Sequence, residues 1–140
     1  MPESLLAKKM NLKAGQQAIV INAPNGFLKE LEPLPAKAKV SEKMEGTPDW
    51  IQVFVNSKAE LEQVFPRVLK LLKQESMLWI TFPKGTSKIQ TDLTRDKGWG
   101  IVQASDLKWI KLVSVNETWS AFALRRFREG EAKQSFRLGA

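Results

Sequence analysis

The sequence predicts an α/β protein built on a three-layer, open mixed sheet of about five strands. Short apolar runs alternate with helix-like segments through the first two thirds of the chain, a pattern typical of parallel strands joined by helical crossovers. Two strand-like runs near the C-terminus are separated by only Asn116 and Glu117, which predicts an antiparallel hairpin. With 140 residues, 43% of them hydrophobic, the chain is long enough for one domain with a substantial core.

The N-terminal part predicts a buried strand over residues 17–22, followed by a helix within "GFLKELEPLP" (26–35). The apolar residues of that segment have helical spacing, Asn25 is the expected cap, and Pro33 and Pro35 end the helix. The segment "AKVSEK" (38–43) is a candidate for a brief edge strand.

The middle of the chain predicts a second buried strand over residues 50–55 and then a helix. Ser57 followed three residues later by Glu60 has the form of a capping box, in which both side chains satisfy free backbone amides. Pro66 lies within the apolar stripe of this helix. Because proline lacks the amide hydrogen, we expect a bend or two helical pieces between Ser57 and Gln74.

The last elements are a third buried strand (78–82), a helix from Thr91 or Asp92 to about Ala104, and strands over 109–115 and 118–126. We expect the first three strands to be parallel neighbours, with 118–126 antiparallel beside the third and 109–115 at the edge. Residues 1–127 would form this single domain, and residues 128–140 a weakly ordered basic tail.

Missing residue types exclude much chemistry. The chain has no Cys, His or Tyr, so thiolate and imidazole nucleophiles and zinc, copper or haem sites that need those ligands are excluded. A magnesium ion held by carboxylates stays open, but we assign no metal and no cofactor, and any catalytic residues are unknown. No 18-residue apolar run and no targeting segment is found, so we expect no membrane association and a cytoplasmic location.

In an open α/β sheet, ligands bind beyond the carboxyl ends of the strands. The turns expected at that edge supply the candidate ligand-binding residues, which are Asn22, Asn25, Gly26, Asn56, Lys84, Gly85, Thr86, Ser87, Lys88, Asp92 and Trp119.

The turn "PKGTSK" (83–88) poses a choice between a phosphate cradle and a simple strand exit. It lacks the Walker A pattern, because it has one glycine and Lys84 precedes it. A looser anion nest of backbone amides with Lys84 or Lys88 stays open. We favour the strand exit, with Gly85 allowing the turn and Lys84 reaching solvent, because the next expected helix starts several residues later.

Three other features have both a functional and a plain interpretation. Asp92 and Asp96 would share a helix face as a carboxylate pair or as a solvated, salt-bridged surface. Trp119 would cover a ligand or belong to the core. A basic cluster near the C-terminus would contact phosphates or remain solvated; it consists of Arg125, Arg126, Arg128, Lys133 and Arg137.

The segments "LKAGQQAIVINAPNGF", "LWITFPKG", "TDLTRDKGW" and "VSVNETWSAFALR" resemble a bacterial family catalogued as domain of unknown function 3052. The resemblance covers about Leu12 to Arg126 and implies no catalytic residues. The strands from residue 48 onward also resemble the later half of a class I methyltransferase sheet, which implies a Rossmann-like fold. The glycine-rich segment that holds S-adenosylmethionine in those enzymes is replaced here by "NAPNGF", and Glu42 or Glu45 is the candidate acidic ribose ligand.

The leading functional hypothesis is a non-catalytic ligand-binding or protein-interaction domain with its site at the carboxyl edge. Its partner would be an anionic small molecule or a protein. One alternative is an enzyme acting on an anionic substrate through Lys84 or Lys88 with Asp92. The other is weak nucleic-acid binding through a basic surface, since the net charge is +7.

Overall fold

The computed structural model describes residues 5–84, 92–94, 97–105 and 107–127. Its elements run in the order α1 (Leu5–Lys9), β1 (Gln17–Ile21), α2 (Phe27–Glu30), β2 (Lys39–Ser41), β3 (Trp50–Phe54), α3 (Lys58–Leu71), β4 (Met77–Pro83), α4 (Gly100–Gln103), β5 (Leu107–Ser114) and β6 (Trp119–Arg126). The weakly ordered tail expected over 128–140 lies outside the described residues.

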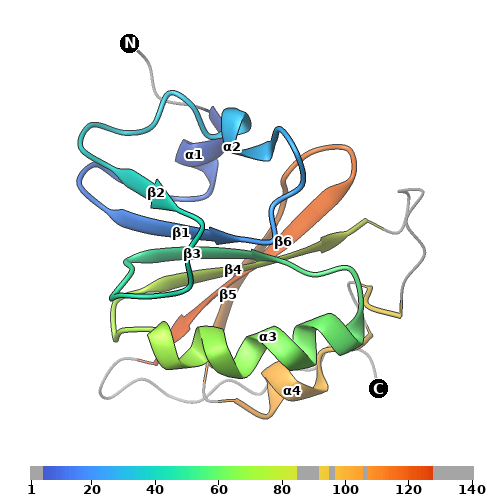
Figure 1. Cartoon of the computed structure of the whole chain (residues 1–140). Coiled ribbons are helices and arrows are strands. Elements are labelled where there is room, and N and C mark those ends of the chain that lie inside the picture. Colours follow the sequence, from blue (N-terminus) through green and yellow to red (C-terminus); the bar gives the residue numbers. More distant parts are fainter. Residues whose placement is uncertain (1–4, 85–91, 95–96, 106, 128–140) are drawn as a thin grey trace.

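The strands form one sheet in the order β2-β1-β3-β4-β6-β5 (Figure 1). Strands β1, β3 and β4 are parallel neighbours, β6 is antiparallel to β4, and β5 is the outer strand of the final hairpin. These relations confirm the predicted topology. The brief strand expected within 38–43 is β2, which pairs in parallel with β1. The sheet therefore has six strands, and the protein is an α/β protein with a Rossmann-like fold.

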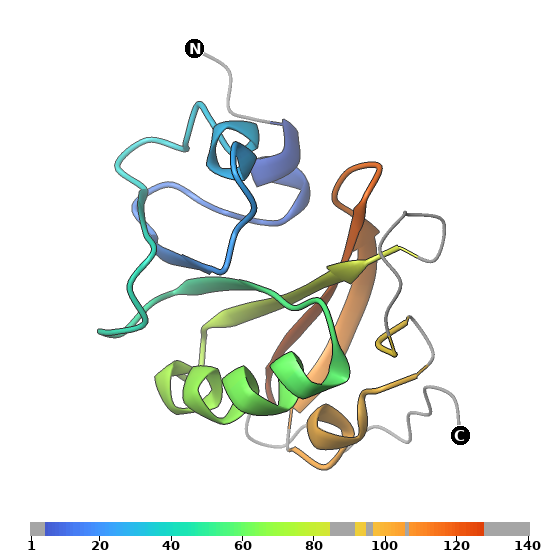
Figure 2. The same cartoon turned by 45° about the vertical axis from the view of Figure 1, so that its right-hand side comes forward.

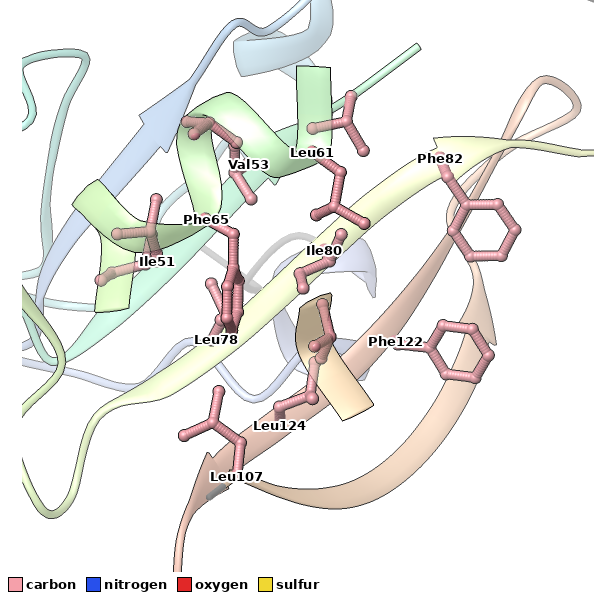
Figure 3. Packing of buried hydrophobic residues seen from close by; sticks show 14 of the residues in the cluster. Ile51, Val53, Leu61, Phe65, Leu78, Ile80, Phe82, Leu107, Phe122 and Leu124 are labelled. Carbon is pink, nitrogen blue, oxygen red and sulfur yellow. The ribbon is translucent and has the colours of Figure 1, made fainter. Parts of the chain in front are cut away.

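Helices cover both faces, which gives the predicted three layers (Figures 1 and 2). Between the sheet and α3/α4 lies an aliphatic and aromatic core, to which β3, α3, β4 and β6 contribute (Figure 3). Inward side chains of α3, among them Leu61, Phe65 and Val68, follow the helical period and pack there. The opposite core lies under α1 and α2 and includes Met10, Phe27 and Trp50 with parts of β1, β3, β4 and β6. No described helix is long and apolar enough to cross a membrane.

Helix α3 runs unbroken through Pro66, so of the two expected outcomes, a bend or two helical pieces, the second is wrong. Pro66 is exposed, and so is Glu62, whose carbonyl oxygen would have received the missing amide hydrogen. Because that carbonyl lies on the solvent side, water can satisfy it. The apolar stripe on the other side of α3 is undisturbed.

The helix expected from Thr91 or Asp92 to Ala104 is also wrong in its first part. Among the described residues of this stretch, only Gly100–Gln103 are helical, and Thr94 forms an isolated antiparallel bridge with Lys97. Gly98 has a φ of 96°, and a Cβ there would come within 2.8 Å of the Leu93 side chain. The chain therefore turns at Gly98 in a conformation that a helix does not allow.

Candidate functional site at the carboxyl edge

The carboxyl ends of β1, β3 and β4 lie side by side at one edge of the sheet (Figure 1). The turn between β5 and β6 lies at the same edge, because Trp119 at the start of β6 pairs with Pro83 at the end of β4. The sequence-predicted loops are thus brought to one edge, as the topology requires.

The first loop carries Asn22, Asn25 and Gly26 away from β1. Asn22 has a φ of 60° and Gly26 a φ of 84°, so two left-handed residues fold the turn. Asn25 does not cap α2: the residue preceding the helix is Gly26, and no side chain caps it. Asparagine and glycine adopt positive φ at low cost, which explains their presence here. The cap prediction failed because the chain reaches α2 through a left-handed residue.

Residues of the second loop, which follows β3, cap the N-terminus of α3. Ser57 Oγ accepts the Glu60 amide hydrogen at 3.2 Å, which confirms the predicted cap. The Glu60 carboxylate reaches back to the Asn56 amide at 2.7 Å, and Asp92 Oδ1 accepts the Lys58 amide at 2.8 Å. Side chains of this protein therefore bind the amides at the start of α3, where an external anion would otherwise be stabilised.

The Asp92 carboxylate therefore holds the first backbone amide of α3, that of Lys58, and Asp92 itself is not part of a helix. The paired-carboxylate hypothesis required a helix through Asp92 and Asp96, and Asp92 is not in one. Asp96 lies outside the described residues.

Lys84 and Lys9 meet at Ser114, the last residue of β5. Lys84 Nζ donates to Ser114 Oγ at 2.6 Å, and Lys9 Nζ donates to the Ser114 carbonyl oxygen at 2.6 Å. Lys84 is half-buried, and its backbone amide also donates to the Thr118 carbonyl oxygen at 2.8 Å. The predicted strand exit therefore places this ammonium group against the β5–β6 hairpin. Gly85, Thr86, Ser87 and Lys88 lie outside the described residues, so the anion nest there stays a prediction.

The β5–β6 turn is organised by Asn116, whose Oδ1 accepts the amides of Thr118 and Trp119 at 2.9 and 3.0 Å. Its Nδ2 donates to the Glu30 carboxylate at the end of α2, at 3.2 Å to Oε1. This contact joins the turn to the α2 layer. Neither Asn116 nor Lys9 was a predicted site residue, because nothing local in the sequence indicates their distant partners.

Trp119 is a core residue and does not present a face for a ligand. Only 7% of its surface is exposed, and its ring meets Phe54 edge-on with centroids 5.1 Å apart. Phe54 in turn meets Phe27 edge-on at 4.7 Å. The interpretation of Trp119 as a core residue is therefore correct, and its ring packs in the core next to the carboxyl edge.

Arg126, from the predicted basic cluster, also serves the fold. Its guanidinium donates to the carbonyl oxygens of Leu72 and Leu69 at 2.9 Å each, and so caps the last turn of α3. Arg125 Nη1 donates to the Arg126 carbonyl oxygen at 2.9 Å. The other members of the cluster lie outside the described residues. For Arg126, the interpretation of the basic cluster as a solvated surface is therefore wrong.

The opposite, amino edge holds Asp49, a group whose pKa is shifted. The Asp49 carboxylate accepts the Gln17 amide at 2.9 Å and forms an ion pair with Lys73 at 2.6 Å. The Gln17 amide, and then Lys73, lower the pKa of Asp49 below its usual 3.8, against a smaller desolvation effect. Within the described ranges, no group of three or more acidic residues could hold a metal ion.

No protein-family model matches the sequence, and no curated protein matches it. Among solved structures, the chain is similar to a SAM-dependent methyltransferase from Aquifex aeolicus, with a TM-score of 0.60 and 15% identity over 85% of this chain and 86% of that one. It is also similar to a protein of the NADB-Rossmann superfamily from Streptococcus agalactiae, with a TM-score of 0.54 and 10% identity over 94% of this chain and 72% of that one. At these identities the likeness shows the fold.

Proposed function

We propose that this chain is a non-catalytic binding domain that holds an anionic small molecule at the carboxyl edge of its sheet. The observation that carries the proposal is the convergence of Lys9 and Lys84 on Ser114. Two ammonium groups within hydrogen-bonding distance of one residue repel each other and create a local positive potential. A phosphate or carboxylate group beside Ser114 would relieve that repulsion and accept hydrogen bonds from both lysines.

The proposed site lies beside Ser114 and not at the start of α3. The start of α3 is already occupied by Ser57, Glu60 and Asp92. The anion would therefore bind on the side of α1 and the β5–β6 hairpin, where Lys9 and Lys84 each contact an oxygen atom of Ser114. Such a site relies on side chains that the fold brings together.

Two features favour binding without catalysis. The enzyme hypothesis needs Asp92 to work with Lys84 or Lys88 as an acid–base pair. Asp92 Oδ1 instead holds the Lys58 amide, and Lys84 Nζ contacts Ser114. Weak nucleic-acid binding is disfavoured because Arg126 is committed to the end of α3.

A second candidate ligand is S-adenosylmethionine or a related nucleoside. Glu42 directly follows β2, whose last residue, Ser41, pairs with Ile19 in the middle of β1, and an acidic residue at the end of a parallel strand could bind ribose hydroxyls. Glu45 instead lines a separate pocket of about 320 Å³ with Gln17 and Thr47. The solved methyltransferase from Aquifex aeolicus motivates the choice of this ligand. We further propose, from the sequence segments alone, membership of the family of domain of unknown function 3052 and a cytoplasmic location.

The test is a thermal-shift and calorimetric screen with inorganic phosphate, ATP and S-adenosylmethionine at constant ionic strength. We expect phosphate or ATP to raise the Tm of the wild type. Lys9→Ala or Lys84→Ala should raise the Kd for the anion about tenfold, which corresponds to a loss of about 1.4 kcal/mol of binding free energy. Lys39→Ala is the matched control, since Lys39 is an exposed lysine on β2 at the far end of the sheet. Glu42→Gln should weaken the binding of S-adenosylmethionine and leave the binding of inorganic phosphate unchanged.

Anion binding that is equally tight in wild type, Lys9→Ala and Lys84→Ala would contradict the proposed site. The absence of any Tm increase with all three ligands would contradict small-molecule binding and leave the protein-partner hypothesis in its place. Short single-stranded DNA is included at low and moderate salt. Salt-resistant DNA binding would favour the nucleic-acid alternative.

A further inference from the structure

The face of the sheet under α1 and α2 carries two polar side chains in the middle of its core. Gln52 of β3 and Thr81 of β4 are fully buried, each with 0% of its surface exposed. Gln52 alternates along β3 with Trp50 and Phe54, which belong to the core under α1 and α2, so its side chain points to the same face. Because burial of a polar group is unfavourable unless it is hydrogen-bonded, the partners of these side chains need an account.

One hydrogen bond joins the two side chains and leaves part of each unused. Gln52 Nε2 donates to Thr81 Oγ1 at 3.0 Å. Gln52 Oε1 is buried and accepts no hydrogen bond from the described residues. The Thr81 hydroxyl accepts this bond, and its own hydrogen has no acceptor within the described part of the chain. Because Oε1 and Nε2 belong to one amide group, a free acceptor therefore lies next to a free donor.

Trp79, beside Gln52 on β4, adds a second buried donor. The two residues are partners in the pairing of β3 with β4, so their side chains share one face. Trp79 is 0% exposed, and its Nε1 has no hydrogen-bond partner among the described residues. The Trp50 indole, in the same core, instead donates to the Met10 carbonyl oxygen at 2.8 Å. An indole N–H of this kind is usually hydrogen-bonded when it is buried.

Small side chains stand next to these polar groups. On β6, Ala123 pairs with Trp79 and Ala121 pairs with Thr81, and both alanines are fully buried. The helices that cover this face, α1 and α2, have only five and four residues. A buried water-sized group needs two to four polar partners. Gln52, Thr81 and Trp79 supply three.

The free groups match a ligand that both donates and accepts. Gln52 Oε1 needs a donor, whereas the Thr81 hydroxyl and Trp79 Nε1 need an acceptor. A hydroxyl group does both, while an ammonium group only donates and a carboxylate only accepts. A hydroxyl group also fits if the Gln52 amide is turned over, because the free part of the amide is then a donor.

We propose that Gln52, Thr81 and Trp79 form a binding site for one hydroxyl group inside the core under α1 and α2. The hydroxyl group accepts hydrogen bonds from Thr81 Oγ1 and Trp79 Nε1 and donates one to Gln52 Oε1. It belongs to a water molecule or to a small alcohol that takes the place of the water. The site shares no residue with the anion site proposed at the carboxyl edge.

The experiment is NMR on the full chain, with rotating-frame Overhauser spectra that separate contact with water from proton exchange. We expect cross-peaks with water at the Trp79 indole N–H and at the Gln52 side-chain amide. The Trp50 indole is the matched control and should show none, since its partner is the Met10 carbonyl oxygen. The variant Trp79→Phe assigns the indole signal.

A titration with ethanol distinguishes the two sources of the hydroxyl group. Saturable shifts of the Trp79 and Gln52 signals, with loss of their water cross-peaks, would identify a site that an alcohol enters. Water cross-peaks that ethanol leaves unchanged would identify a water molecule as the ligand. Wild type that shows neither a water cross-peak nor an ethanol shift at these groups would overturn the proposal.

Two variants test the partners of the hydroxyl group. Gln52→Met keeps the length of the side chain and removes the acceptor, and Thr81→Val keeps its shape and removes the hydroxyl. We expect each to abolish or weaken the water cross-peak at Trp79 and to shift its indole signal, with the Trp50 indole unchanged. A Trp79 cross-peak that persists unchanged in both variants would also overturn the proposal. If neither variant folds, the wild-type spectra still decide it.

Discussion

The two edges of the sheet use polar side chains in different ways. At the amino edge, Lys73 is paired with a carboxylate, Asp49, which also accepts the Gln17 amide. At the carboxyl edge, Lys9 and Lys84 contact the neutral oxygen atoms of Ser114, while the carboxylates of Glu60 and Asp92 hold backbone amides. A lysine is thus paired with a carboxylate where the strands begin, and two lysines approach the oxygen atoms of one serine where they end.

This difference shows that a polar strand-end loop is not automatically a ligand site. The Asn56–Ser57 turn and Asp92 have the residue types of an anion site, yet they start α3. The sequence around Lys9, in the short helix α1, gave no indication of a binding site, yet Lys9 Nζ donates a hydrogen bond to the Ser114 carbonyl oxygen. Which residues remain for a ligand is decided by what the fold itself has already used.

The largest expected effect is at the carboxyl edge, for Trp119→Ala. Its ring is buried against Phe54, so its removal should lower the free energy of unfolding by about 3–5 kcal/mol. Urea unfolding monitored by circular dichroism measures this. A loss below about 1 kcal/mol, together with a loss of ligand binding, would instead make Trp119 a ligand contact and break the comparison.

Next is Asp49→Asn at the amino edge, which removes the ion pair with Lys73 and weakens the bond to the Gln17 amide. We expect a loss of about 1–3 kcal/mol at neutral pH, as for hydrogen bonds to charged groups. Glu62→Gln, an exposed change on α3, is the control and should have almost no effect.

The same variant has a defined pH dependence. Because the folded-state pKa of Asp49 is below 3.8, its contribution is fully present above that value and is lost as the pH falls through the lowered pKa. The stability difference between wild type and Asp49→Asn should therefore shrink as the pH is reduced from neutral to about 3. A difference that stays constant over this range would mean that the ion pair contributes nothing.

A smaller effect is expected for Ser57→Ala, at the start of α3. Removal of the Ser57 hydroxyl leaves the Glu60 amide without its cap, which typically costs about 1 kcal/mol. Asp92→Asn should cost less, because an amide oxygen can still accept from the Lys58 backbone. If Asp92→Asn proved costlier than Ser57→Ala, the long-range contact and not the local cap would dominate this helix start.

The smallest effect on stability is expected for Lys84→Ala. Its contact with Ser114 is at the surface, so the free energy of unfolding should change by less than about 0.5 kcal/mol. Chemical denaturation without ligand measures this, beside the anion titration proposed above. A stability loss of more than about 2 kcal/mol would identify Lys84 as a structural residue, like Lys73 at the other edge.

The sequence by itself determined the sheet. The apolar runs around Ile19, Ile51 and Ile80 are parallel strands, and the close spacing of β5 and β6 makes them a hairpin. It also determined the Ser57 cap, since the partner is three residues away. These features depend on local spacing and on continuous apolar runs, which a linear pattern records directly.

Only the tertiary structure decided the rest. The turn at Gly98 replaced a helix, because the backbone there passes close to Leu93. Lys9 meets Ser114 across 105 positions in the sequence, and Asp92 meets Lys58 across 34. A pocket at the amino edge of the sheet joins residues from Lys13 to Arg125 beside a bulge at Ile110. Such contacts depend on strand order, register and side-chain direction together, and no local stretch of sequence encodes all three.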